Sequence, residues 1–429
     1  MPLFCTAQGS PPSMNPLELG KHYVSGIPVT VSSSARTRHL YLVGQTGSGK
    51  STILENLIAQ DLAAGEGVAL VDPHGDLSER VVLNIPQNRA KDLIYIDCSD
   101  LARPMGINLL ADVHPDKRSK VADDIVTAFI HVFGEHAVAD RSQEVLRNSL
   151  IALMERKGET LLSVLRLLRD ESYRSSVIQN IQDPLARSYW LDEFAEYDPR
   201  FREQVTAPIL NKLDACLSHI ALRNFLSQPT SSFSIRHAID RRQIIIVNLS
   251  KGQLGTTASK FLGALIVSIL CQTALSRTDV PEQERTPFHL YADEFQNFAT
   301  ESFSVVLSEA RKYALTLTLA HQHLHQVPQT IQDAVIGNAG TLVAFRLGAT
   351  DAPLIARHFG IKNAEQLQDL PNYTAYVRQL PPSDPIRINT NPPPAPLRTS
   401  AEKLIKHSQN HFGRKREDVE RQIQRLFRA

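Results

Sequence analysis

The sequence has few cysteines, no excess of either charge and no hydrophobic run long enough to span a bilayer. Its four cysteines among 429 residues have neither CxxC nor CxxxxC spacing, which argues against a zinc site or a disulfide framework and favours a reducing cytoplasm. The 46 Lys and Arg against 45 Asp and Glu exclude an overall attraction to nucleic acid or anionic lipid. Any contact with a polyanion must therefore be local.

Segments that would direct the chain into a membrane are also lacking. Residues 1–16 have no basic stretch followed by an apolar run, which a signal peptide requires. The longest uncharged run, 261–276, has 16 residues and includes Gln272 and Thr273, so we expect a buried helix there. If the protein works at a membrane, we expect a partner to hold it there.

Apolar, β-branched runs bounded by turn residues predict buried parallel strands. They lie at 39–44, 67–72, 93–97, 243–249, 288–293, 315–321 and 340–347. Helical patterns separate most of them, which is typical of a doubly wound α/β domain with helices on both faces of the sheet. From about 114 to 236, apolar residues recur every three to four positions instead. This spacing predicts an all-helical insertion within the α/β domain.

The two ends of the chain have other patterns. Residues 22–33 predict a β-hairpin at the sheet edge, and seven prolines within 381–396 predict an extended strap followed by an amphipathic helix at 416–427. From 397 onward, nine Lys and Arg face four Asp and Glu, a composition that suits DNA, anionic lipid, a neighbouring subunit or a solvated helix. The expected units are an edge hairpin (1–37), an α/β core in two parts (38–113 and 237–380), the helical insertion (114–236), and the strap with its basic helix (381–429).

The stretch GQTGSGKS, 44–51, fits the phosphate-loop pattern GxxxxGK[ST] and lies between an apolar strand and a helix. Its glycines let backbone N–H groups surround a β-phosphate, and the helix N-terminus adds its dipole. We expect Lys50 to bridge the β- and γ-phosphates and Ser51 to ligate magnesium, with ATP and Mg²⁺ as cofactors. The predicted nucleotide-binding residues are Gly44, Gln45, Thr46, Gly47, Ser48, Gly49, Lys50, Ser51 and Thr52.

A phosphate loop needs an acidic residue at the end of a second strand, and FHLYADEF supplies one. Asp293 ends the strand and is expected to hold the magnesium through water. Glu294 is expected to polarise the attacking water. The acidic pair favours hydrolysis over kinase chemistry, because a kinase with its own acceptor does not need a base that activates water.

Two further residues flank the next strand, 315–321. Gln322 follows it and is therefore placed to sense the γ-phosphate or to orient water. Arg311 precedes the strand and is not expected to reach the nucleotide of its own chain. We expect it to act as an arginine finger in the site of a neighbouring subunit; the alternative is an ordinary surface pair with Lys312.

Three other motifs carry weaker signals. HQHLH, 321–325, offers three histidines, but no carboxylate or cysteine accompanies them and the strand is expected to end there, which disfavours a metal site. LSKGQ, 249–253, looks like the signature loop of ABC transporters but follows a strand, where that loop would open a helix. VDPHGDL, 71–77, fits a site role at the nucleotide edge and a turn stabilised by Asp72 equally well.

Taken in order, these motifs resemble the HerA/FtsK superfamily of pumping ATPases, and most of all the soluble part of type IV secretion coupling proteins of conjugation systems. The segments that carry the resemblance, over roughly 20–425, are the phosphate loop, DPHGDL, RPMGINLL, VNLSKGQLG, YADEFQNF, RKYALTLTLAHQ and GNAGTLVAFRLGATDA. The resemblance implies a RecA-like motor that forms a hexameric ring and drives DNA through a central channel with ATP. It also implies that the helical insertion meets DNA-processing and substrate proteins.

Residue by residue, the resemblance assigns the same roles as the motifs. Lys50 and Ser51 match the phosphate-loop positions of the family, and the pair Asp293–Glu294 matches its acidic pair. Gln322 matches the sensor, and Arg311 matches the arginine that acts in trans.

Two features depart from the family pattern. Coupling proteins usually begin with two transmembrane helices and HerA proteins with a small β-barrel, and this sequence has neither. We therefore expect a cytoplasmic protein that is recruited to the membrane by a partner, or that serves defence, repair or a mobile element.

The function expected from the sequence is ATP-driven DNA translocation. The segment 250–257 is a candidate pore loop, although a tight strand-to-helix turn fits it equally well. The alternative function is an adaptor that binds ATP for ring assembly and recruits secretion substrates. An adaptor predicts little stimulation of hydrolysis by DNA.

Overall fold

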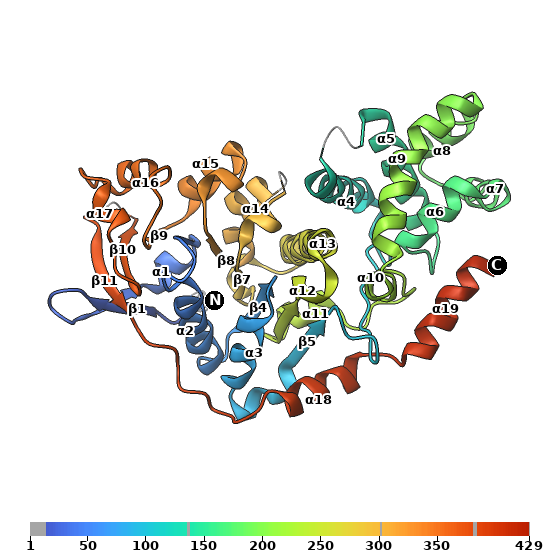
Figure 1. Cartoon of the computed structure of the whole chain (residues 1–429). Coiled ribbons are helices and arrows are strands. Elements are labelled where there is room, and N and C mark those ends of the chain that lie inside the picture. Colours follow the sequence, from blue (N-terminus) through green and yellow to red (C-terminus); the bar gives the residue numbers. More distant parts are fainter. Residues whose placement is uncertain (1–13, 135–137, 301–302, 381–383, 429) are drawn as a thin grey trace, which may run out of the picture.

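A computed structural model describes residues 14–134, 138–300, 303–380 and 384–428 (Figure 1). Within these residues the chain builds one eleven-stranded sheet with the strand order β2-β1-β11-β10-β9-β3-β8-β7-β4-β6-β5. The strands are β1 Leu17–His22, β2 Pro28–Val31, β3 Leu40–Val43, β4 Gly67–Asp72, β5 Leu93–Asp97, β6 Ile244–Asn248, β7 Phe288–Ala292, β8 Leu315–His321, β9 Thr341–Ala344, β10 Thr374–Gln379 and β11 Ile386–Thr390.

The strands from β9 to β5 in this order are parallel, and β2, β1, β11 and β10 continue the sheet in antiparallel fashion. The parallel part consists of the seven strands predicted from the apolar runs, and the predicted α/β class with a mainly parallel sheet is confirmed. Those runs are continuous because both faces of a parallel sheet are buried. Of the antiparallel part, the sequence predicted only a hairpin at the edge; β10 and β11 were not predicted as strands.

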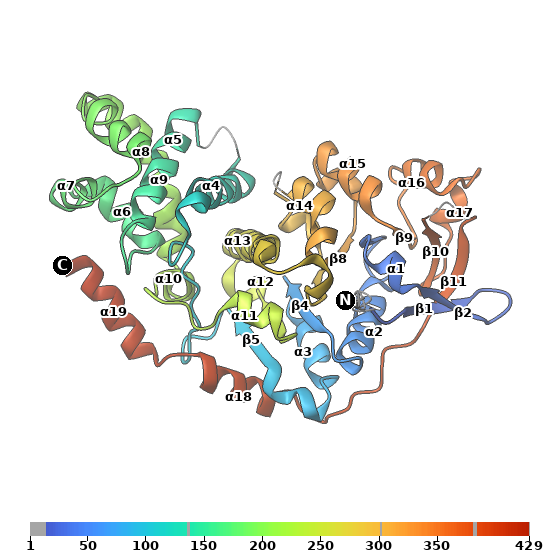
Figure 2. The same cartoon turned by 180° about the vertical axis from the view of Figure 1, so that it is seen from behind.

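Successive side chains along the strands pack into two different cores, one on each face of the sheet. Leu40 and Leu42 of β3 belong to the core beneath helices α2 (Lys50–Ala63) and α3 (Asp76–Leu83), whereas Tyr41 and Val43 face the other core. This alternation follows from the two-residue repeat of a strand. Figure 2 shows from behind how helices cover both faces.

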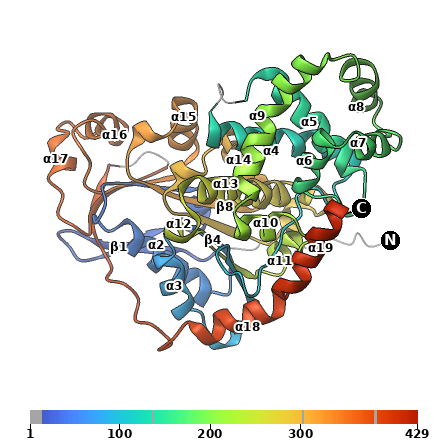
Figure 3. The same cartoon turned by 45° about the vertical axis from the view of Figure 1, so that its right-hand side comes forward.

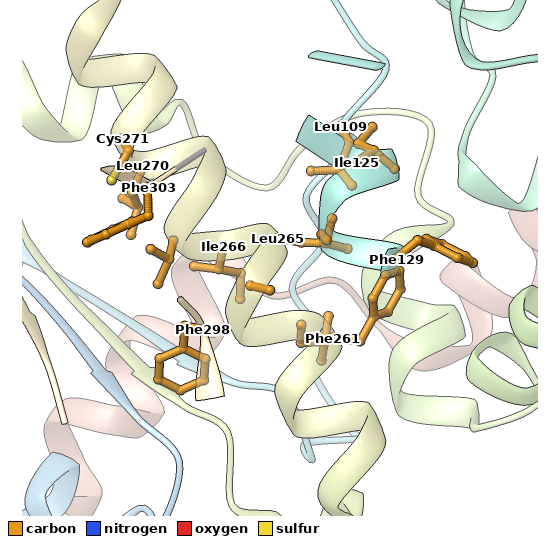
Figure 4. Close-up of a cluster of buried hydrophobic side chains, with 14 of the residues drawn as sticks. Leu109, Ile125, Phe129, Phe261, Leu265, Ile266, Leu270, Cys271, Phe298 and Phe303 are labelled. Atoms are coloured by element: carbon orange, nitrogen blue, oxygen red, sulfur yellow. The ribbon is translucent and has the colours of Figure 1, made fainter. Parts of the chain in front are cut away.

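Helix α13 (Thr256–Leu275) lies at the centre of the second core. Its Phe261 and Leu265 pack with Ile125 and Phe129 of α4 (Arg118–Phe133), which joins the helical insertion to the sheet (Figure 4). Among the described residues, one helical stretch, Thr256–Asp279, is long and apolar enough to cross a membrane, but 67% of its most apolar window is buried in the protein. The expected buried helix is therefore present.

Between β5 and β6 the described chain is mainly helical, and the helices from α4 to α9 form the lobe at the upper right of Figure 1. After α4 it contains α5 Asp140–Met154, α6 Leu161–Arg169, α7 Glu171–Ile178, α8 Pro184–Ser188, α9 Pro199–Leu217 and α10 Ile220–Leu226. The remaining helices of the core are α1 Ser33–Arg36, α11 Ile235–Asp240, α12 Lys251–Leu254, α14 Phe303–Glu309, α15 Gln329–Asn338, α16 Ala352–Phe359 and α17 Glu365–Gln368. The exact unit boundaries given above stay a prediction.

The C-terminal residues run from β11 along the sheet to the edge strand β5 and on to the helical lobe (Figure 3). The expected strap is partly wrong, because Ile386–Thr390 forms β11 and pairs with β1 and β10; residues 381–383 lie outside the described part. Helix α18 (Glu402–Phe412), which was not predicted, reaches the opposite edge strand, where the Oγ of Ser408 accepts the N–H of Tyr95 at 2.8 Å.

The last helix, α19 (Arg416–Arg428), confirms the predicted one and packs on the helical insertion. The side chain of Arg166 in α6 donates to the carbonyl of Leu426 at 2.9 Å. The chain thus ties the antiparallel part of the sheet and the edge strand β5 to the helical insertion, because the contacts of β11, α18 and α19 follow one another along it.

The N-terminal hairpin is present at the sheet edge, but its bounds differ from those predicted. Its first strand, β1, begins at Leu17 and not at 22, because the buried residues Leu17 and Leu19 already face the core. Residues 1–13 of the expected segment, Cys5 among them, lie outside the described part of the chain. The other three cysteines are buried and free.

Candidate active site

Strand β3 and helix α2 hold the phosphate loop between them, and all nine predicted residues lie in the loop or the first turn of α2. Gly47 and Gly49 have φ angles of 75° and 120°, which the backbone of residues other than glycine rarely adopts. A Cβ atom on Gly49 would lie 3.1 Å from the ring of Tyr373 and 3.2 Å from that of Phe345. Position 49 therefore needs glycine both for its conformation and for its space.

Lys50 begins α2, and its ammonium group is buried inside the loop. Its Nζ donates to the carbonyl of Gly44 at 2.5 Å and to that of Gln45 at 3.1 Å. Burial lowers the pKa of Lys50, whereas the carboxylates of Glu294 and Asp293 act in the opposite direction. A phosphate oxygen is a stronger partner for an ammonium group than a backbone carbonyl and would take the place of these contacts.

Asp293 follows β7 and faces the start of α2. The hydroxyl of Ser51 donates to Oδ2 of Asp293 at 3.3 Å. The pKa of Asp293 is raised to about 7, first by burial and then by the neighbouring carboxylates Glu294 and Asp72, while Lys50 acts against them. A hydroxyl and a carboxylate are ligands of the oxygen type that Mg²⁺ takes, and the crowding of carboxylates favours a bound cation. The donor set therefore fits the expected metal.

Glu294 is connected to the phosphate loop through Gln322. The hydroxyl of Thr46 donates to Oε1 of Gln322 at 2.9 Å, and Nε2 of Gln322 donates to Oε1 of Glu294 at 2.6 Å. The other oxygen of Glu294 accepts the amide of Gln296 at 2.6 Å. The strand order explains this meeting, because β3, β8 and β7 are neighbours and the carboxyl ends of parallel strands share one edge.

The loop after β4 contributes from the same edge. Oδ1 of Asp72 accepts the N–H of His74 at 2.9 Å, and Oδ2 accepts that of Ser78 at 2.8 Å. Both oxygens of this carboxylate therefore stabilise the turn and the start of α3. Of the two interpretations of VDPHGDL, the contacts favour the turn, although the charge of Asp72 also acts on Asp293.

The family of the chain follows from a match over most of its length. Residues 21–375 match the family described as the type IV secretion-system coupling protein DNA-binding domain. The chain belongs to this family. The match runs from the end of β1 to the start of β10 and includes the phosphate loop, the acidic pair and the helical insertion. The resemblance expected from the sequence, and with it the class of DNA-translocating ATPase, is confirmed.

Solved structures agree on the fold. The bacterial conjugative coupling protein TrwB, in a form named TrwBdeltaN70, is 16% identical over 91% of this chain and 96% of its own, with a TM-score of 0.65. TrwB in complex with the ATP analogue ADPNP is 18% identical over 89% and 92%, with a TM-score of 0.64. VirB4 of Thermoanaerobacter pseudethanolicus is 15% identical over 89% and 96%, with a TM-score of 0.60. No curated protein sequence matches the chain.

Arg311 lies apart from the other candidate residues of the coupling protein. It is exposed in the 3-10 turn η8 (Ala310–Tyr313), immediately before β8, whereas Gln322 follows the same strand. The seven residues of β8 are extended, so its two ends, one near Arg311 and the other at Gln322, are about 23 Å apart. Arg311 therefore does not join the phosphate loop of its own chain, as expected.

The three histidines of HQHLH take different positions. His321 ends β8, is buried, and shares a hydrogen bond with the hydroxyl of Tyr41 at 3.0 Å. His323 and His325 lie beyond the strand: His323 precedes the turn η9 (Leu324–Gln326), and His325 lies within it. The expectation that extended geometry ends at this point is confirmed.

Two residues that line or approach the site were missed by sequence reasoning. Tyr373 lies at the start of β10 and lines the hollow over the phosphate loop, and its N–H donates to the carbonyl of Ser48 at 2.8 Å. Lys251 begins α12; burial lowers its pKa, while the nearby Glu294 acts against this. Tyr373 belongs to none of the motifs, and Lys251 lies in LSKGQ, whose pattern gave it no role at the nucleotide, so only the fold brings these two residues to the site.

Proposed function

We propose that this coupling protein works as a hexameric ring in which each subunit hydrolyses Mg²⁺-ATP to move DNA through the central channel. The observation that carries the proposal is the continuous chain of hydrogen bonds from Thr46 through Gln322 to Glu294. It links the group that would contact the γ-phosphate to the group that would activate water. An ATPase needs a connection between these two groups, because Glu294 should activate water only when a triphosphate is bound beside it.

Nucleotide binding falls to the phosphate loop. Lys50 would exchange its carbonyl partners for oxygens of the β- and γ-phosphates, and Ser51 and Asp293 would hold Mg²⁺. When bound, the metal neutralises the charge that develops on the phosphate oxygens. The TrwB structures support this proposal, because one of them holds an ATP analogue and another holds ADP and Mg²⁺.

Glu294 is proposed as the general base. An ionised carboxylate has about four acceptor positions, and the amides of Gln322 and Gln296 use one on each oxygen. The remaining positions are available to a water molecule. The two amides fix the orientation of the carboxylate, which is what a base requires in order to hold water in line with the γ-phosphate.

Arg311 is proposed to act in the site of the neighbouring subunit. Its exposure and its distance from the phosphate loop of its own chain support this role. Arg311→Ala is expected to lower hydrolysis at least a hundredfold, and mixing it with Lys50→Ala is expected to restore part of the rate, because each variant supplies what the other lacks. Lys312→Ala is the matched control, since Lys312 is the exposed neighbour. Full activity of Arg311→Ala would make Arg311 an ordinary surface residue.

We further propose that the protein is cytoplasmic, reaches the membrane through partners, and contacts DNA-processing and substrate proteins through the helical insertion 114–236. The packing of α19 on this lobe supports a coupled movement of the lobe and the sheet, because the same C-terminal segment contacts both.

The steady-state rate of ATP hydrolysis with and without double- and single-stranded DNA tests the proposal, with Lys50→Ala as the blank. We expect DNA to raise the rate several-fold, and the rate per subunit to rise with protein concentration as shared sites form. A rate indifferent to DNA would overturn the translocase and favour the adaptor.

A further inference from the structure

A second group of metal-ligating side chains lies beside the active site and has no part in the proposed hydrolysis. His323 and His325 follow β8, and Asp351 precedes α16 (Ala352–Phe359) in the loop after β9. One ligand atom from each of the three lies within 4.8 Å of the others. The sequence pattern HQHLH lacked a carboxylate, and the fold supplies one from 26 residues beyond His325.

The spacing of these atoms is close to that of a metal site. Nδ1 of His323 is 3.5 Å from Oδ2 of Asp351. Ligand atoms about 2.0–2.1 Å from a tetrahedral zinc ion are roughly 3.3 Å from one another. The rings of His323 and His325 face each other with their centroids 5.4 Å apart and an interplanar angle of 26°. The ligand atom of the exposed His325 lies within 4.8 Å of those of His323 and Asp351.

The carboxylate is held in place before any ion binds. The side chain of Asp351 is only 5% exposed, and its Oδ2 accepts the N–H of Leu324 at 3.2 Å. Among the described residues, its one ion pair is with His323, and no Lys or Arg neutralises it. His323 is 35% exposed at its side chain and His325 is exposed, so an ion and a coordinated water have access from solvent.

We propose that His323, His325 and Asp351 bind a divalent transition ion of the zinc class. Imidazole nitrogens suit such ions, whereas Mg²⁺ takes oxygen ligands, so this site and the pair Ser51–Asp293 select different metals. The ion would join the end of β8 to the loop before α16, immediately after Gln322. It would then restrict the segment that carries Gln322.

Titration of the nucleotide-free protein with Zn²⁺ by calorimetry, and with Co²⁺ by its visible absorption, tests the proposal after removal of any histidine tag. We expect one equivalent to bind in the micromolar range or tighter, and His325→Ala to weaken binding at least tenfold. His325 is exposed, so its replacement leaves the fold intact. Asp351→Asn is expected to weaken binding as well.

Two controls locate the metal. His237→Ala removes another exposed histidine, and Asp293→Asn removes the carboxylate of the proposed magnesium site; both are expected to keep Zn²⁺ affinity within twofold of the wild type. Zn²⁺ should also raise the thermal midpoint of the wild type more than that of His325→Ala, since only a native-state ligand stabilises the fold. Binding unchanged in His325→Ala, or lost in Asp293→Asn, would overturn the site.

Discussion

Replacing Asp293 with asparagine is expected to stabilise the nucleotide-free protein while abolishing its response to Mg²⁺. Burial and the neighbouring carboxylates raise the pKa of Asp293 from 3.8 to about 7. One pKa unit corresponds to about 1.4 kcal/mol, so keeping this carboxyl ionised costs the folded protein roughly 4 kcal/mol at pH 8. Asparagine has nearly the same shape and carries no charge, so it avoids this cost.

The sign of the pH dependence follows from the direction of the pKa change. Below pH 3.8 the carboxyl is protonated in the folded and the unfolded chain, and it adds no pH dependence. As the pH rises from 3.8 to 7, the folded protein retains the proton that the unfolded chain loses, and stability falls. The advantage of Asp293→Asn is therefore expected to grow from roughly 2 kcal/mol at pH 5 to roughly 4 kcal/mol at pH 8.

Thermal unfolding at pH 5 and pH 8, in the presence of EDTA, measures the effect. For a chain of this length, about 4 kcal/mol corresponds to an increase of roughly 4 °C in the midpoint. Asp116→Asn is the matched control, because the side chain of Asp116 is 86% exposed, and it should leave the midpoint within about 1 °C. If Asp293→Asn is no more stable than the wild type at pH 8, the assignment of a buried carboxyl with a raised pKa is wrong.

Three further substitutions test other parts of the structure. Gln322→Ala removes the amide that orients Glu294, and hydrolysis is expected to fall roughly tenfold to a hundredfold while ATP affinity changes less than threefold, as measured by turnover and by titration of a fluorescent ATP analogue. Gly49→Ala places a Cβ in a left-handed, crowded position, and calorimetry is expected to detect no ATP binding. Arg36→Met leaves the fully buried Asp61 without its ion pair, and urea unfolding is expected to show a loss of about 3–5 kcal/mol.

The parallel strands were predictable because each is a continuous apolar run, as burial on both faces demands. The antiparallel extension was harder to predict. β10 carries Arg378 and β11 carries Arg387 and Asn389, and the prolines around β11 suggest a free strap. Pairing with β1, which is about 370 residues away in sequence, makes β11 a strand, and no local pattern reports such a partner.

The core of the candidate site was predictable for a topological reason. Asp293 and Gln322 directly follow apolar strands, and Lys50 closes the phosphate loop after a third; these residues meet because the three strands are neighbours in a parallel sheet. Tyr373 and Asp351 do not directly follow an apolar strand. They enter from the start of an antiparallel strand and from a loop beyond the sheet edge, so their position depends on tertiary packing.

Movement along DNA can be measured by displacement of a third strand from a triplex at one end of a linear duplex. With ATP, the wild-type protein is expected to release the labelled third strand. Glu294→Gln is expected to bind ATP and DNA without releasing it, because the residue proposed to activate water is then neutral. Hydrolysis stimulated by DNA without any displacement of the third strand would contradict translocation.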